Sequence, residues 1–225
     1  MDTLAKKLNW HYETVPAETK VALDFLSKEK WLESSHWYLA GGTALALQSG
    51  NRKSVDLDFF TTEKNFDVEE LLANFVGNTN WQTSVEEKNT IYGVLCKAKV
   101  SFIAYPFFVP KLTMNKHGTI NVLAPIDIAV MKIIAVSQRG RKRDFFDLYW
   151  CAKNIEPLDS LIRKLKVQYP SVAHDYNHIL KSLVYFEDAE VDPEPEIYFK
   201  CGWDEIKAFF ETEIPRITRE LIGLN

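Results

Sequence analysis

Apolar and polar positions change their period near the middle of the chain. In the first half, apolar residues recur at helical spacing over residues 17–33 and 66–75, the second run with Asn65 as its N-cap. Strand-like runs lie at residues 37–40, 55–59, 81–87, 91–98 and 100–106. This order predicts an α+β fold, with a mixed sheet core and flanking helices.

From Pro125 the pattern becomes helical. Apolar residues at helical spacing predict helices at residues 126–138, 143–154, 158–168, 172–184 and 203–222. The change of pattern divides the chain into a core at residues 1–124 and a helical C-terminal lobe at 125–225. Residues 187–196 are acidic and interrupted by prolines, which predicts an exposed loop.

A glycine pair stands where the strand at 37–40 meets the next apolar run. Gly41 and Gly42 let the backbone approach a ligand closely, and Thr43 can cap a helix that runs to about Ser49, with Gly50 as its stop. Free N–H groups at such a helix start bind anions. The pattern is typical of a phosphate cradle, although a plain cap is the better explanation of these residues when they are taken alone.

Two carboxylates follow this turn on one strand. Within residues 55–59 apolar and acidic residues alternate, so Val55, Leu57 and Phe59 would share one face and Asp56 and Asp58 the other. Their Cα atoms would stand about 7 Å apart. Hard cations such as Mg²⁺ commonly take one or two protein carboxylates, with substrate phosphates completing the shell. An exposed strand face is the alternative, but the nearby glycine turn favours a metal site.

Four residues on the predicted helices have structural explanations. Lys132 lies on an apolar and small-residue stripe, so it either extends from the edge of the core or reaches a phosphate in a cleft. Asp127 stands in a first helical turn, where a carboxylate stabilises the helix dipole. Asp144 and Asp147 lie three residues apart on one helix face, and Asp144 can pair with the basic residues before it.

Composition restricts the class of protein. The 225 residues are 46% hydrophobic, no run approaches the roughly 18 apolar residues of a membrane helix, and we expect a cytoplasmic protein without membrane contact. Its three separate cysteines suit reduced thiols. The net charge of −4 argues against general, sequence-independent binding to nucleic acid. Residues 139–143 nevertheless contain four cations, which suit either a contact with RNA or a triphosphate, or a solvated loop.

Two further patterns favour structural interpretations. His174 and His178 are four residues apart, as in some zinc sites, but no third ligand accompanies them, so we expect no metal there. The aromatic run at residues 102–108 could stack on bases, yet a buried strand ending at Pro106 explains it more simply.

Four segments together resemble a known family. Residues 40–43, 52–59, 125–135 and 141–149 are similar to the motifs of the AbiEii/AbiGii toxins, minimal nucleotidyltransferases of the DNA polymerase β-like superfamily. The resemblance implies a nucleotidyltransferase-like sheet core and a cleft to which the helical lobe contributes Lys132 and Asp144. It also implies that a nucleoside triphosphate and Mg²⁺ or Mn²⁺ bind there, that RNA such as a tRNA end accepts the nucleotide, and that a cognate antitoxin neutralises the toxin. The implied nucleotide-binding residues are Gly41, Gly42, Thr43, Arg52 and Ser54. The implied catalytic residues are Asp56, Asp58, Lys132 and Asp144, with Asp56 and Asp58 as metal ligands. The implied RNA or phosphate contacts are Arg141, Lys142 and Arg143, and Asp147 is a further candidate for the site.

The chain departs from this superfamily at one position. A third carboxylate usually comes from a neighbouring core strand, and here residues 99–105 contain no acid, so Ser101 occupies that place. Either Asp144 or another acid substitutes, or nucleotide transfer is weak. Together the motifs favour a Mg²⁺-dependent nucleotidyltransferase toxin. The alternatives are a non-catalytic nucleotide- or RNA-binding module and an aminoglycoside-type enzyme acting on a small molecule.

Overall fold

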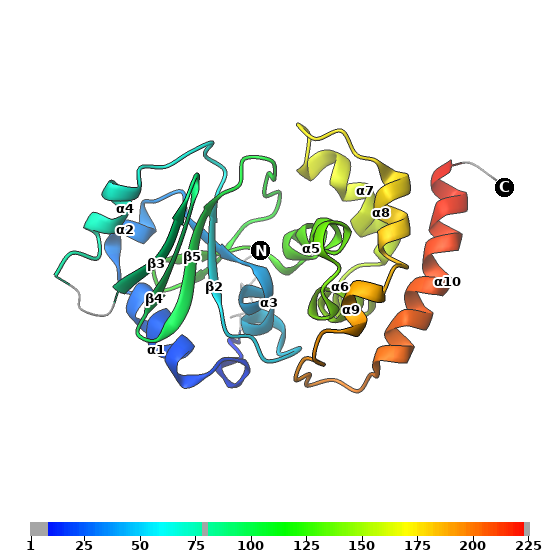
Figure 1. Ribbon diagram of the computed structural model, residues 1–225, viewed down its shortest axis with the longest axis horizontal. Helices are drawn as coiled ribbons and strands as arrows, with labels where there is room; N and C mark the ends of the chain where they lie inside the picture. The colour runs from blue at the N-terminus through cyan, green and yellow to red at the C-terminus, as the bar shows by residue number, and fades with distance from the viewer. Residues whose placement is uncertain (1–8, 78–80, 223–225) are drawn as a thin grey trace, which may run out of the picture.

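A seven-stranded mixed sheet forms one side of the molecule, and a group of helices forms the other (Figure 1). The computed structural model describes residues 9–77 and 81–222. The strands are β1 (Tyr38–Ala40), β2 (Leu57–Thr61), β3 (Trp81–Glu87), β4 (Thr90–Leu95), β5 (Ala98–Ala104), β6 (Asn115–His117) and β7 (Ile120–Val122). The fold class predicted from the sequence is confirmed.

The sheet order is β3-β4-β5-β2-β1-β7-β6. Strand β2 lies near its centre, antiparallel to β1 and parallel to β5. Along β2 the side chains alternate: Leu57 and Phe59 are fully buried, and Phe59 stacks on Phe102 of β5 with ring centroids 5.1 Å apart. Because successive residues of a strand point to opposite faces, Asp58 and Phe60 face away from this core.

Helices cover the sheet and build the second half of the molecule. The helix α5 lies between the sheet and the remaining C-terminal helices, and α10 forms the far edge (Figure 1). The helical elements are η1 (Tyr12–Thr14), α1 (Ala17–Leu26), α2 (Lys30–Glu33), α3 (Gly41–Ser49), α4 (Val68–Ala73), α5 (Pro125–Arg139), α6 (Lys142–Asn154), α7 (Leu158–Gln168), α8 (Tyr176–Ser182), α9 (Glu187–Glu190) and α10 (Trp203–Ile222). No helix within the described ranges has the length and apolar character that a bilayer crossing requires.

The two halves are joined by more than the chain between β7 and α5. The amide of Lys53 donates to the carbonyl of Glu196, and that of Tyr198 donates to the carbonyl of Asn51, both at 2.8 Å. A late segment of the chain therefore pairs with the loop that precedes the aspartate strand.

Several predicted boundaries are confirmed and others are wrong. The runs at 81–87, 158–168 and 203–222 are elements with those bounds, and Gly50 ends α3 with a φ of 66°. The run at 17–33 is two helices, α1 and α2. The helix expected at 66–75 spans only α4, and its N-cap is Asp67, whose carboxylate accepts from the amide of Glu70, rather than Asn65.

Other corrections follow from short elements. Strand β2 begins at Leu57, so Val55 lies outside it with 45% of its surface exposed rather than on the buried face. The acidic segment expected to be a loop contains the short helix α9, and the helix expected at 172–184 is only α8. Strands β6 and β7 were not predicted, because three residues are too few to show a period.

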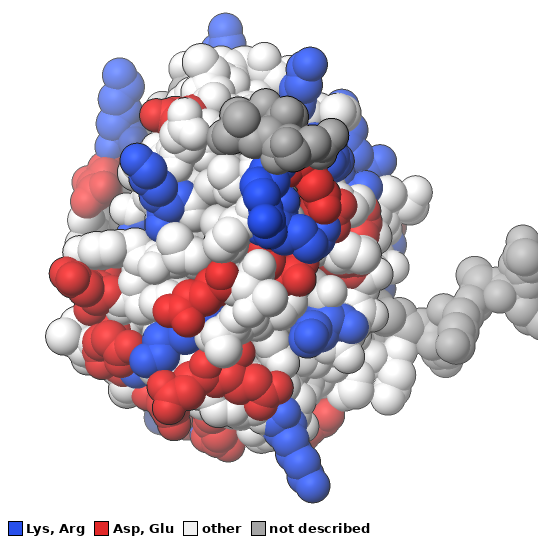
Figure 2. Space-filling model, turned by 90° about the vertical axis from the view of Figure 1, so that its right-hand side faces the viewer, with Lys and Arg blue, Asp and Glu red and all other residues white. Residues whose placement is uncertain are grey.

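The face of the molecule that carries α10 mixes both charges. Acidic side chains gather in the lower part of this face, and most of the lysines and arginines lie in its upper part (Figure 2). Basic side chains of α10 are partly neutralised on the helix itself, since Arg216 pairs with Glu213 at 2.6 Å and with Glu220 at 2.7 Å. This face therefore carries both charges.

Candidate functional site

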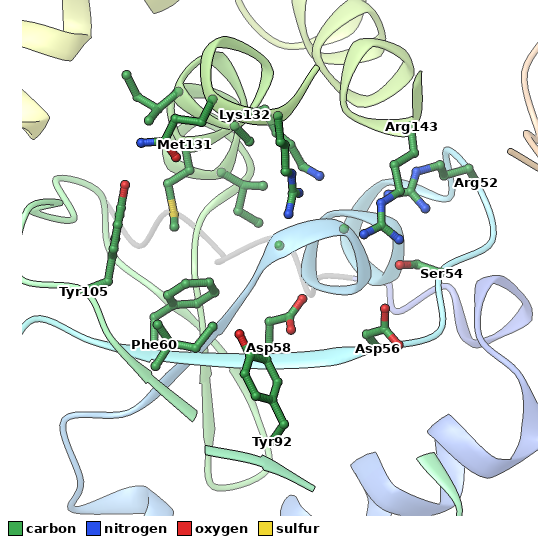
Figure 3. A pocket seen from close by; sticks show the side chains of 18 of the residues that line it. Arg52, Ser54, Asp56, Asp58, Phe60, Tyr92, Tyr105, Met131, Lys132 and Arg143 are labelled. Atoms are coloured by element: carbon green, nitrogen blue, oxygen red, sulfur yellow. The ribbon is translucent and has the colours of Figure 1, made fainter. Parts of the chain in front are cut away.

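A cleft of about 360 Å³ opens between the sheet and α5. Its walls come from the start of α3, the loop before β2, the exposed face of β2, β4 and β5, and one side of α5 (Figure 3). The volume lies within the range of sites that hold small molecules and cofactors. Candidates from both halves of the sequence meet here, including Gly41, Asp58 and Lys132.

The glycine turn closes one wall of the cleft. Gly41 has a φ of +72°, a conformation that side chains rarely adopt, and a Cβ there would lie 3.1 Å from Asp58 Oδ2. At Gly42 a Cβ would lie 2.3 Å from Arg52 Nη2 and 3.1 Å from Ser54 Oγ. The backbone conformation of Gly41 therefore favours glycine, whereas a side chain at Gly42 would displace the Arg52 guanidinium. The first amides of α3 stand beside the carboxylates and the guanidinium.

Two aspartates stand on the floor of the cleft. Asp58 is half-buried, and its Oδ1 accepts a hydrogen bond from Ser101 Oγ at 2.7 Å. Burial raises the pKa of the Asp58 carboxyl, and the negative charge of Asp56 raises it further, whereas the Ser101 hydroxyl opposes the rise. Asp56 precedes β2 and points into the same space (Figure 3). The paired carboxylates form a site of negative charge that a cation would stabilise.

Thr43 has a different place from the one expected. It is the third residue of α3, not its cap, and its buried side chain lies outside the cleft wall. The Thr43 hydroxyl is 2.8 Å from Ser54 Oγ and donates to the carbonyl of Asp56. Thr43 therefore fixes the backbone that presents Asp56, and Ser54, which does line the cleft, is held by it.

Behind the cleft lies a buried ion network. Asp147 on α6 is fully buried and accepts from Arg52 Nε at 2.7 Å, Arg52 Nη2 at 2.8 Å and Asn51 Nδ2 at 2.9 Å. Lys132 Nζ lies 2.7 Å from Asp147 Oδ2 and 2.7 Å from Asp144 Oδ1. Burial alone would raise the pKa of Asp147, but the Arg52 and Lys132 charges outweigh it and lower the pKa below its ordinary value. Asp147 thus holds the two cations that border the cleft.

Asp144 belongs to the same network and does not reach the cleft. It is fully buried, and its Oδ2 accepts from Arg139 Nε at 2.8 Å in addition to its pairing with Lys132. Burial opposes ionisation, yet the two cations hold the pKa of Asp144 far below its usual range. Its carboxylate oxygens are already engaged, so the structure places Asp144 beside the catalytic candidates without bringing it to the space that substrate would fill.

The three cations at 141–143 lie in three different environments. Arg143 lines the cleft and points toward the aspartates (Figure 3). Arg141 turns away and pairs with Asp192 at 2.7 Å. Lys142 is buried, with its Nζ 5.3 Å from the ring centroid of Trp203. Only Arg143 of the three expected contacts is brought to the cleft.

The end of the cleft remote from Arg52 is apolar, and the sequence did not indicate it. Tyr105, Phe60 and Met131 stand together there (Figure 3). The aromatic run was expected to be core, which holds for Phe102 and Phe108, but Tyr105 beyond the end of β5 lines the cleft. The register of a strand decides which of its side chains face the cleft, and register cannot be read from the sequence alone. The remaining apolar lining residues are Ile103, Ile128, Ile134, Ala135 and Tyr169.

The donor set fits a divalent cation that is shared with a bound phosphate. Asp56 and Asp58 supply hard oxygen ligands beside amides and cations suited to phosphate oxygens. In the part of the chain that the structure describes, no group of three or more His, Cys, Asp or Glu residues could enclose a metal. In the sheet register Ser101 lies directly opposite Asp58, so the position of a third ligand carries a hydroxyl.

Sequence comparison decides the family of this chain. The model of the family described as "Nucleotidyl transferase AbiEii toxin, Type IV TA system" matches residues 24–88 and 99–217. The chain belongs to the AbiEii family. It is therefore a nucleotidyltransferase of a toxin–antitoxin family, as the motifs indicated. An Aquifex aeolicus (strain VF5) protein, the uncharacterized aq_aa25, is 36% identical over 186 residues, which are 79% of this chain and 86% of that protein.

Solved structures confirm the fold of this AbiEii family member. JHP933 from Helicobacter pylori superposes with a TM-score of 0.52 at 18% identity, covering 94% of this chain and 98% of that one. MenT4, a nucleotidyltransferase toxin from Mycobacterium tuberculosis H37Rv, gives a TM-score of 0.52 at 18% identity, covering 90% of this chain and 86% of that one. The match extends over both the sheet and the helical half.

Proposed function

We propose that this AbiEii-family protein transfers a nucleoside monophosphate from a nucleoside triphosphate to a hydroxyl of RNA, with a tRNA end as the acceptor, using Mg²⁺ or Mn²⁺. The observation that carries the proposal is the meeting of Asp56 and Asp58 with the glycine turn of α3 in one cleft. A type IV toxin–antitoxin family supports a cognate antitoxin that neutralises the activity. We expect the protein to act in the cytoplasm.

The chemistry of the cleft orients the nucleotide. Backbone amides at Gly41 and Gly42, together with Arg52, Ser54 and Arg143, make one end suited to the triphosphate. The apolar end around Tyr105 and Met131 suits the nucleobase, and the α-phosphate would then lie over the carboxylate pair. This arrangement assigns different parts of the substrate to the two ends of the cleft.

The reaction forms one bond and breaks another at the α-phosphorus. The acceptor oxygen bonds to the α-phosphorus, the bond from that phosphorus to the bridging oxygen breaks, pyrophosphate leaves, and the hydroxyl proton passes to solvent. A divalent cation held by Asp56 and Asp58 would stabilise charge on the reacting phosphate. Lys132 contributes positive charge at the cleft wall, while Asp147 and Asp144 keep it in place. Arg143 is the side chain best placed to hold the leaving pyrophosphate.

Expression without an antitoxin tests the toxin part of the proposal. We expect the wild-type protein to slow growth, and Asp56→Ala or Asp58→Ala to relieve the effect because the carboxylate pair is lost. Asp192→Ala, which removes a carboxylate paired with Arg141 outside the cleft, is the matched control and should remain toxic. Equal toxicity of the Asp58→Ala variant at equal protein level would contradict the proposal.

A further inference from the structure

A row of side chains leads from the carboxylates across the sheet to its outer strand. In the register, Asp58 of β2 lies opposite Ser101 of β5, Ser101 lies opposite Tyr92 of β4, and Tyr92 lies opposite Val85 of β3. Residues directly paired across neighbouring strands point to the same face of a sheet. The row therefore lies on the cleft face and continues outward from the catalytic site.

The row becomes more exposed with distance from Asp58. Ser101 has 3% of its surface exposed, Tyr92 41% and Val85 47%. The neighbouring pair on the same face, Val94 and Lys99, is half-buried and exposed, respectively. We call the surface made by Val85, Tyr92, Val94 and Lys99 the outer ramp.

The opposite face of the same strands is closed. Ile91, Leu95 and Phe102, which alternate with the ramp residues, are fully buried in the core. The outer ramp is thus the open side of a rigid sheet, and an aromatic ring stands at its junction with the cleft. Tyr92 lies next to Asp58 with its hydroxyl end directed into the cleft (Figure 3).

The two ends of the cleft are already suited to the triphosphate and the nucleobase, so an acceptor needs a third approach to the α-phosphate. The outer ramp is continuous with the row that contains Asp58, and it reaches solvent through Tyr92. Its chemistry also suits RNA, because Tyr92 and Val85 offer apolar surface to a base and Lys99 offers a cation to a phosphate.

We propose that the outer ramp binds the terminal nucleoside of the RNA acceptor, with the Tyr92 ring stacking on its base and directing its hydroxyl toward Asp58. The proposal rests on the proposed function, because it assigns a surface to the acceptor of that reaction. It adds a substrate-binding residue, Tyr92, on a strand outside the four motifs by which the family is recognised.

Photo-crosslinking tests the location without requiring transfer. The probe is a single-stranded RNA with 4-thiouridine as its 3′-terminal nucleotide, and the crosslinked peptide of the full-length protein is identified by mass spectrometry. We expect the crosslink to fall within residues 81–105. A crosslink elsewhere, or none at an RNA concentration that saturates binding, would overturn the ramp assignment, whereas failure of the proposed function would appear as absent transfer to any RNA.

Steady-state kinetics of transfer test the role of the ring. Tyr92→Ala should raise the KM for RNA by about 10-fold or more, because a stacked base is lost, while the KM for the nucleoside triphosphate stays near the wild-type value. Tyr92→Phe keeps the ring and should restore the KM for RNA. Val85 lies at an exposed position that tolerates a charge. Val85→Glu should therefore also weaken RNA binding, because the added carboxylate repels the RNA phosphates.

Matched controls separate the ramp from a general surface effect. Tyr185, 47% exposed, and Val191, 86% exposed, lie in the helical half, so Tyr185→Ala and Val191→Glu should leave the KM for RNA unchanged. Equal KM values for Tyr92→Ala and wild type would overturn the proposal. So would efficient labelling of protein hydroxyls in place of RNA, because the ramp would then serve another class of acceptor.

Discussion

Asp58 is subject to two opposing requirements. The role that we propose for it needs the ionised form, but burial and the neighbouring Asp56 raise the pKa of its carboxyl. The Ser101 hydroxyl stabilises the ionised form through a 2.7 Å hydrogen bond. Ionised Asp58 therefore lowers the free energy of unfolding of the metal-free protein, and a bound cation would remove this destabilisation. Such destabilisation is typical of functional positions.

The substitution Asp58→Asn tests whether ionised Asp58 destabilises the folded protein. The folded-state pKa of Asp58 is raised, so its ionised form destabilises the folded protein above the unfolded-state pKa, including at pH 7. We expect Asp58→Asn to raise the melting temperature in metal-free buffer while lowering nucleotide transfer by about 100-fold or more. Calorimetry and transfer assays measure both effects, and a lower melting temperature of a folded variant would contradict the electrostatic argument.

The pH profile tests the role of Ser101. Ser101 lowers the pKa of Asp58, so Ser101→Ala should raise that pKa further. Because the proposed role of Asp58 as a metal ligand requires its ionised form, we expect activity to be lost as the pH falls through the pKa of Asp58. The acidic limb of kcat/KM should therefore move to higher pH in Ser101→Ala, and an unmoved limb in a folded variant would show that Asp58 does not control it.

At the scale of elements, the buried network explains how distant segments build one wall. Asp147 on α6 holds Arg52, which precedes β2, and Lys132, which belongs to α5. Arg52 in turn stands against Gly42 at the start of α3. Three helices and a loop are thereby fixed around the phosphate end of the cleft.

Removal of the Asp147 charge should strongly destabilise the folded protein. Asp147→Asn removes the charge that compensates two buried cations, and we expect a loss of about 3–5 kcal/mol in the free energy of unfolding. Asp192→Asn, which weakens a pair with half-exposed Arg141, should cost at most about 1 kcal/mol. Urea denaturation at pH 7 measures both losses, and similar losses would contradict the importance of the network.

The same network gives a pH dependence of stability. The pKa of Asp147 is lower in the folded protein than in the unfolded chain, so the stabilisation is present above the unfolded-state pKa. It is lost as the pH falls through the folded-state pKa.

The glycine turn gives a prediction about binding. A Cβ on Gly42 would lie 2.3 Å from Arg52 Nη2, so Gly42→Ala must displace the guanidinium from the start of α3. We expect at least about a 10-fold loss of nucleoside triphosphate affinity by calorimetric titration. Gly202→Ala is the matched control, because a Cβ there meets nothing within 4 Å, and wild-type affinity in Gly42→Ala would contradict the assignment.

At the scale of the whole molecule, the sequence predicted the long elements and singled out Asp56 and Asp58, which the structure brings into one cleft, because period, glycine punctuation and alternating acids are local signals. It did not reveal that Asp144 and Asp147 are buried partners of Lys132, since ion pairing between helices depends on packing. Tyr92 and Tyr105 were missed for a related reason: the register of β4 and β5 decides which face they occupy. The roles of the site residues and the division at residue 124 stay predictions.

The contacts between the two halves predict cooperative unfolding. Backbone hydrogen bonds join residues 51–53 to 196–198, and the buried network joins Arg52 to α6. Separate unfolding of residues 125–225 would expose both sets of contacts. We expect a single thermal transition, with coincident midpoints by far-ultraviolet circular dichroism and tryptophan fluorescence, whereas two separated transitions would show independent lobes.

Nucleotide transfer itself is the most direct measurement. Purified protein is incubated with Mg²⁺, total cellular RNA and each α-labelled nucleoside triphosphate in turn, beside the Asp56→Ala/Asp58→Ala variant. We predict that label from at least one donor enters RNA and that the variant abolishes it, with pyrophosphate released in equal amount. Absence of label from every donor, or label that persists in a folded variant lacking both carboxylates, would contradict the assignment of this cleft as an RNA nucleotidyltransferase site.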